Sequence, residues 1–138
     1  MKTLTLDAQL DNLSKVLLFI DAQLEAADCG IKAQTQIDIA VEELFVNVAN
    51  YAYKDKVGEV TVSIDICDRG GMCAVITLTD SGEPYDPLKK PDPDVTLSAE
   101  ERQIGGLGIY IVKKSMDDVT YEYKDGTNNI TIVKRIEM

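Results

Sequence analysis

The strongest constraint on the fold is a change in the spacing of the apolar residues, which occurs near residue 58. Before this point they recur every three or four residues, as on one face of a helix; the clearest set is Ile37, Val41, Phe45 and Val48. After it they alternate with polar residues, as in a half-buried strand; the clearest set is Val60, Val62, Ile64 and Ile66. The chain therefore combines amphipathic helices with strands that have one buried face.

The order of the expected elements indicates how they are layered. In chain order they are a strand at 2–7, a helix from Asp11 or Asn12 to about Ala27, a helix at 32–53, strands at 60–66 and 74–80 around an Arg69-Gly70-Gly71 turn, a helix from about Leu107 to Met116, and strands at 119–124 and 130–135. Because most strands follow one another as hairpins, we expect a two-layer α/β (α+β) sandwich. Its mixed, largely antiparallel sheet would carry the helices on one face, in one domain over residues 1–138.

The composition excludes several classes of function. A net charge of −10 argues against nucleic acid as a partner, because phosphates require a basic surface; the acidity fits a solvated surface or a face for a basic partner. No apolar run approaches the roughly 20 residues of a membrane span, and no signal peptide is recognisable, so we expect a cytoplasmic protein that binds no membrane. The absence of histidine excludes a Ser-His-Asp triad and the usual zinc sites.

A polar stripe accompanies the apolar face of the helix predicted at 32–53. Glu43, Asn47 and Asn50 are spaced i, i+4 and i+7, so they share one side of that helix. Asn47 offers a neutral oxygen suited to Mg²⁺ between phosphate oxygens, and Glu43 can take a proton from an attacking hydroxyl or water. A solvated helix face, or amides bonded to the sheet, would explain the same stripe.

Asp80 ends a predicted strand on the face that should be buried, because it continues the parity of Ile76 and Leu78. A buried carboxylate must be hydrogen-bonded. The partner is either the local backbone, in an Asx-turn of the sequence DSG, or the exocyclic amine of a nucleobase. Gly82 would let a flat base lie against the backbone.

Two features follow Asp80. Residues 82–104 contain all four prolines, and so long a connection is usually a functional lid or a disordered segment. Arg102 in this lid is the preferred candidate to neutralise phosphate charge, with a solvated lid charge as the alternative. A glycine run then precedes a helix whose free N–H groups and dipole favour an anion such as phosphate, unless it serves loop geometry alone; it comprises Gly105, Gly106, Leu107 and Gly108.

The order E-x₃-N, D-x-G, lid and G-G-x-G before a helix resembles the GHKL-type (Bergerat-type) ATP-binding fold of type II topoisomerases, histidine kinases and mismatch-repair ATPases. Within that superfamily the chain is most similar to the anti-sigma factor serine/threonine kinases of bacteria, from TLTLDAQLDNL through DSGEPYDP to NNITIVKR. The resemblance implies that Glu43 is the general base and that Asn47 is the Mg²⁺ ligand. Asp80 would bind adenine, Gly82 would line its pocket, and Asn50 would lie in the nucleotide site where many relatives carry His. Arg102 and residues 105–108 would contact the phosphates.

The same resemblance implies ATP and Mg²⁺ as cofactors and a homodimer through the sheet or the first strand. It further implies two protein partners, an anti-anti-sigma (STAS-type) protein phosphorylated on Ser or Thr and a sigma factor that is sequestered. Histidine kinases usually carry Asn at the position of Glu43, so a carboxylate here favours transfer to a hydroxyl, or hydrolysis. Two other functions stay open: a regulatory module that binds nucleotide without transferring phosphate, and an interaction domain that binds no nucleotide.

Overall fold

The computed structural model describes residues 1–53, 57–89 and 106–137. The predicted elements are all present, with ends within a few residues of those expected. They are β1 (Lys2–Asp7), the 3₁₀ turn η1 (Leu10–Asn12), α1 (Leu13–Ala26), α2 (Ile31–Tyr51), β2 (Glu59–Asp68), β3 (Met72–Asp80), the 3₁₀ turn η2 (Pro87–Lys89), α3 (Gly106–Ser115), β4 (Asp118–Lys124) and β5 (Thr127–Arg135). Asn12 does precede α1, but its side chain makes no capping bond and instead donates to the Asp7 carbonyl oxygen, at 2.8 Å.

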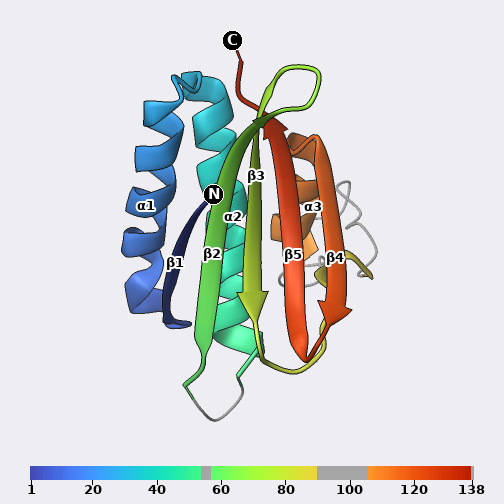
Figure 1. Ribbon diagram of the computed structural model, residues 1–138. Helices are drawn as coiled ribbons and strands as arrows, with labels where there is room; N and C mark the ends of the chain where they lie inside the picture. The colour runs from blue at the N-terminus through green and yellow to red at the C-terminus, as the bar shows by residue number, and fades with distance from the viewer. Residues whose placement is uncertain (54–56, 90–105, 138) are drawn as a thin grey trace.

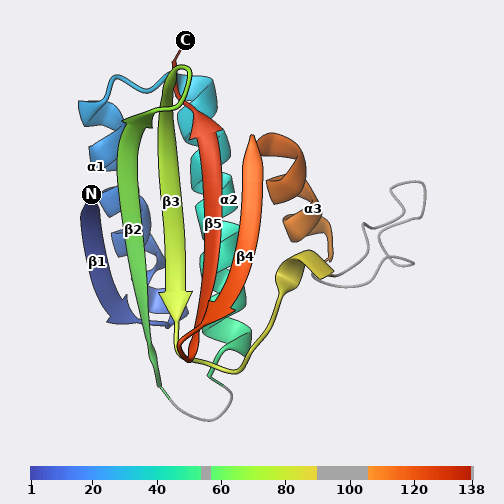
Figure 2. The same cartoon turned by 45° about the vertical axis from the view of Figure 1, so that its right-hand side comes forward.

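The five strands form one sheet in the order β1-β2-β3-β5-β4 (Figure 1). The three α-helices of the described residues lie on one face of it (Figure 2), which confirms the predicted two-layer sandwich. Every strand pair in the described residues is antiparallel, so the parallel component that the prediction allowed is not seen there. None of the described helices is long and apolar enough to cross a membrane.

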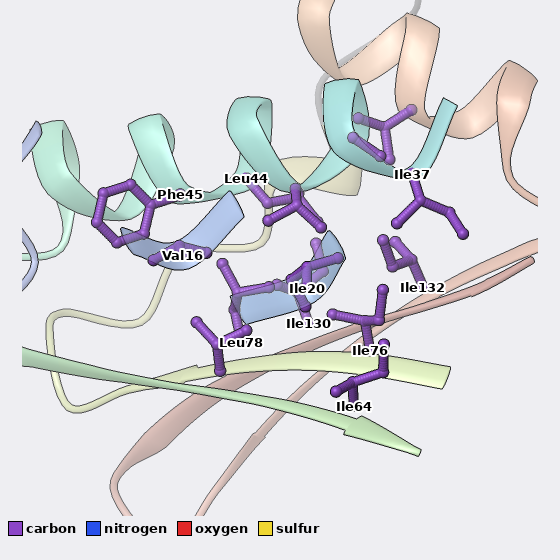
Figure 3. Close-up of a cluster of buried hydrophobic side chains, with 14 of the residues drawn as sticks. Val16, Ile20, Ile37, Leu44, Phe45, Ile64, Ile76, Leu78, Ile130 and Ile132 are labelled. Atoms are coloured by element: carbon purple, nitrogen blue, oxygen red, sulfur yellow. The ribbon is translucent and has the colours of Figure 1, made fainter. Parts of the chain in front are cut away.

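The core lies between the helices and the inward face of the sheet (Figure 3). The alternating residues of β2 and β3 point into it, and Phe45 of α2 and Ile20 of α1 are fully buried against them. Burying a side chain of this size contributes about 1.5–3 kcal/mol relative to leaving it exposed. The helical and alternating patterns of the sequence therefore meet in one core, which fixes α2 across the central strands.

One end of this sheet departs from apolar packing. Asp80 is the last residue of β3, and the strand register places it directly opposite Asn128 near the start of β5. Both side chains are 6% exposed, and they are the two polar residues buried among the described residues. The fold thus brings a carboxylate and an amide together under the C-terminal half of α2.

Candidate functional site

The Asp80 carboxylate is held by two donors that reach the same oxygen. Its Oδ1 accepts hydrogen bonds from the Gly82 backbone N–H and from Asn128 Nδ2, each at 2.9 Å. The first of these is the Asx-turn that the sequence DSG allowed as one of two alternatives. Since no other bond from the described residues reaches the carboxylate, Oδ2 is the oxygen that can accept a bond from a ligand.

A cavity of about 40 Å³ adjoins Asp80. α2 supplies one wall with Asn47, Val48 and Tyr51, and the opposite wall comes from Tyr121 and Ile130 at the end of the sheet. The cavity is therefore lined mainly by apolar and aromatic side chains, with a buried carboxylate and two amides among them. This composition is typical of a small-molecule site.

Three tyrosines of this cavity were not identified from the sequence. The rings of Tyr51 and Tyr85 lie 6.3 Å apart between centroids and are tilted by 37°. The Tyr121 hydroxyl donates to Asn128 Oδ1, and its pKa is raised, chiefly by burial. Such rings offer flat apolar faces against which a planar heterocycle can pack.

The structure divides the predicted polar stripe of α2 into three environments. Asn47 lines the cavity, whereas Asn50 is exposed and lies outside its lining. Glu43 is half-buried against the first turns of α3: a Cβ built on Gly108 would lie 2.0 Å from Glu43 Oε2. The stripe therefore runs from the N-terminal part of α3, through the cavity, to solvent.

Gly82 contacts the end of α2. A Cβ at this position would lie 2.2 Å from the Ala52 carbonyl oxygen, so the close approach requires glycine. Tyr53 supports the same turn, since its hydroxyl accepts a bond from the Ser81 N–H and donates to the Glu59 carbonyl, both at 2.7 Å. Burial is the largest cause of its raised pKa. These contacts fix the turn that carries Asp80, while Gly82 is absent from the cavity lining.

The phosphate side of the predicted site is described only in part. Arg102 and Gly105 lie outside the described residues, and α3 begins at Gly106, with Leu107 and Gly108 next in the helix. Lys113 and Lys114 lie in the last turn of α3, where cations favour the helix dipole. The described residues contain no cluster of three or more His, Cys, Asp or Glu suited to a metal, so a Mg²⁺ ion here would depend on the Asn47 amide oxygen, water and phosphate oxygens.

Comparison with known proteins places this geometry in a family. Residues 6–134 match the family described as the histidine kinase-like ATPase domain. The chain belongs to this family. The match runs from the end of β1 into β5, and so includes Glu43, Asn47, Asp80 and Asn128.

Individual relatives agree with the family. The chain is 29% identical over 131 residues to the serine-protein kinase RsbW of Listeria monocytogenes serovar 1/2a, covering 91% of this chain and 82% of the relative. It is 31% identical over 97 residues to the serine-protein kinase RsbW of Bacillus mycoides, covering 64% and 56% of the two chains. These matches confirm the resemblance to the anti-sigma factor serine/threonine kinases.

A solved structure shares the fold. The crystal structure of the RsbU and RsbW domains of Rv1364c from Mycobacterium tuberculosis superposes with a TM-score of 0.63 at 13% identity. The superposition covers 99% of this chain and 33% of that one. The two-layer arrangement of helices on one sheet is therefore shared with that crystal structure.

Proposed function

We propose that this protein is a Mg²⁺-ATP-dependent serine/threonine kinase that acts in partner switching. It phosphorylates a Ser or Thr of an anti-anti-sigma (STAS-type) protein, sequesters a sigma factor, or does both. The observation that carries the proposal is the line of polar groups along α2. Asn47 lies in the cavity beside the buried Asp80, and Glu43, one turn earlier on α2, lies beside the start of α3. Membership of the histidine kinase-like ATPase family supports the same function.

The cavity suits the base of the nucleotide. Asp80 Oδ2 accepts a hydrogen bond from the exocyclic amine of adenine, and the bond gains strength because the acceptor is charged. The neighbouring tyrosine rings and Val48 exclude water from the base. In this arrangement the sugar and the phosphates extend from the cavity towards α3, where Asn47 and Glu43 lie nearest to them.

Glu43 suits proton transfer. Its Oε2 atom, beside Gly108, accepts the proton of the attacking Ser or Thr hydroxyl while the new oxygen–phosphorus bond forms and ADP leaves. The backbone N–H groups at the start of α3 favour negative charge on the phosphates. Mg²⁺, when bound, neutralises phosphate charge and orients the transferred group, and the Asn47 amide oxygen is the ligand that this chain offers it.

The function is tested with Glu43→Ala and Asn47→Ala, using calorimetry for ATP binding and radiolabel transfer to a STAS-type partner. Glu43→Ala should retain ATP affinity and lose at least 100-fold in transfer, within the range ascribed to general bases. Asn47→Ala should lose the Mg²⁺-dependent part of the affinity. The matched control is Glu42→Ala, an exposed carboxylate on the adjacent position of α2.

Three outcomes would contradict parts of the proposal. Unchanged transfer by Glu43→Ala would exclude this residue as the base. ATP that stays intact after long incubation of the wild type with a bound partner would exclude the kinase and favour a nucleotide-binding regulatory module. No response to any adenine nucleotide would leave an interaction domain.

A further inference from the structure

Both the nitrogen and the oxygen of the Asn128 side-chain amide form hydrogen bonds to groups around the candidate site. Its Nδ2 donates to Asp80 Oδ1 and the Glu83 carbonyl, both at 2.9 Å, and to the Gly82 carbonyl at 3.4 Å. Its Oδ1 accepts from the Tyr85 backbone N–H at 3.1 Å and from the Tyr121 hydroxyl. An amide has two donor hydrogens and two acceptor lone pairs, so the longer contact to Gly82 shares a hydrogen with another bond and this side chain is saturated.

The neighbours allow only one orientation of the amide. The Tyr85 N–H can only donate, and the Glu83 carbonyl can only accept. Turning the amide by 180° would oppose donor to donor and acceptor to acceptor inside a site that is almost closed to solvent, which costs free energy. Asn128 therefore presents a donor to Asp80 and cannot present an acceptor.

We propose that Asn128 is a positioning residue that sets the nucleobase selectivity of the site, a proposal that rests on the nucleotide-binding function above. Together with the Gly82 N–H, it engages Oδ1 of Asp80, fixes the rotation of the carboxylate and leaves Oδ2 facing the ligand. An adenine base presents an amine at carbon 6 and donates to Oδ2. A hypoxanthine or guanine base presents a carbonyl there, which places two acceptors against each other and is rejected.

The same amide fixes the opposite wall of the cavity. Its bonds to Gly82, Glu83 and Tyr85 hold the segment after β3, and its bond with Tyr121 ties that segment to β4. Removal of the amide releases this wall and leaves the Gly82 N–H as the remaining donor to the carboxylate among the described residues. The carboxylate can then rotate and take a proton or a water between itself and a 6-oxo base, so discrimination falls.

The test compares ATP with inosine triphosphate, which differs at carbon 6 of the base, by calorimetry with Mg²⁺. The wild type should prefer ATP by about 10- to 150-fold, the range for a hydrogen bond to a charged group. Asn128→Ala should lower this preference at least fivefold. The matched control is Asn129→Ala, the next residue of β5, whose side chain contacts Thr79 and Thr127 instead.

A second variant gives a signature that a general structural role would not produce. Asn128→Asp places two carboxyl groups at hydrogen-bond distance, and such a pair shares one proton. While protonated, the new side chain still donates to Asp80; when it loses the proton the two carboxylates repel. ATP affinity of this variant should therefore fall as pH rises from 5 to 8, while that of the wild type stays level. The other titratable groups packed around this pair are Glu83, Asp86, Tyr53, Tyr85 and Tyr121.

The outcomes separate the two proposals. A wild type that binds neither nucleotide would overturn both. A wild type that prefers ATP, together with a folded Asn128→Ala that keeps the full preference, would overturn the role of Asn128 and leave the proposed function intact. A level pH profile for Asn128→Asp, measured on protein with a native circular dichroism spectrum, would also overturn it.

Discussion

Asp38 gives a prediction whose size follows from the structure. The residue lies on α2 facing α1, and its Oδ1 is buried without a hydrogen-bond partner among the described residues. Its pKa is raised from 3.8 to about 7, first by burial and then by the neighbouring Asp21 and Glu25. The folded state therefore binds a proton on this group more tightly than the unfolded state does.

The sign and size of the effect follow from proton linkage. Because the folded pKa is the higher one, the stabilisation by the bound proton is complete below pH 4 and is lost as pH rises towards 7. A difference between 3.8 and about 7 corresponds to at most about 4 kcal/mol. Solvent reaches part of this side chain and screens its charge, so we expect about 1–2 kcal/mol.

Asp38→Asn removes the ionisation and adds an N–H donor beside Asp21. Its free energy of unfolding should exceed that of the wild type by about 1–2 kcal/mol at pH 8, and the difference should shrink towards pH 4. Urea denaturation followed by far-ultraviolet circular dichroism at pH 4, 5, 6, 7 and 8 measures both quantities. Asp118→Asn, at an exposed position of β4, is the control for loss of one negative charge. A variant no more stable than the wild type at pH 8 would refute the reasoning.

Two glycine substitutions should separate stability from catalysis. Gly82→Ala places a methyl group 2.2 Å from the Ala52 carbonyl oxygen, a backbone atom, so we expect a loss of about 1–3 kcal/mol in urea denaturation. In Gly108→Ala the close atom is Glu43 Oε2, the mobile end of a side chain, so the protein should unfold within about 1 kcal/mol of the wild type while phosphoryl transfer falls at least tenfold. Equal stability losses in the two variants would contradict this distinction, as would normal transfer by Gly108→Ala.

Much of the fold could be predicted from the sequence, because the helical spacing of apolar residues indicates a helix and their strict alternation indicates a strand. The alternation before Asp80 placed this carboxylate on the buried face, and the structure confirms that position. Helical spacing alone could not predict which neighbouring elements contact each of the three polar residues on α2. Asn50 shares a side of the helix with Asn47, yet it is exposed and lies outside the cavity lining, whereas Tyr51 is part of that lining.

Asn128 was missed for a different reason. It is one of two adjacent asparagines, and its importance comes from pairing with Asp80, 48 positions earlier in the chain. A signal did exist: Asn128 has the parity of Ile130 and Ile132, so alternation alone predicts that it points inward. Which of its neighbours it contacts depends on the register between β3 and β5, and the sequence pattern does not fix that register.

The tyrosines around the cavity have an optical consequence. The chain contains no tryptophan and six tyrosines, so its ultraviolet emission comes from phenol rings alone. Three of the six, Tyr51, Tyr85 and Tyr121, line one cavity, and Tyr53 braces the turn beside it. A molecule that enters the cavity alters the surroundings of half of the emitting rings at once. The unlabelled protein thus carries its own fluorescent reporter at the site, and no tryptophan emission is present to obscure it.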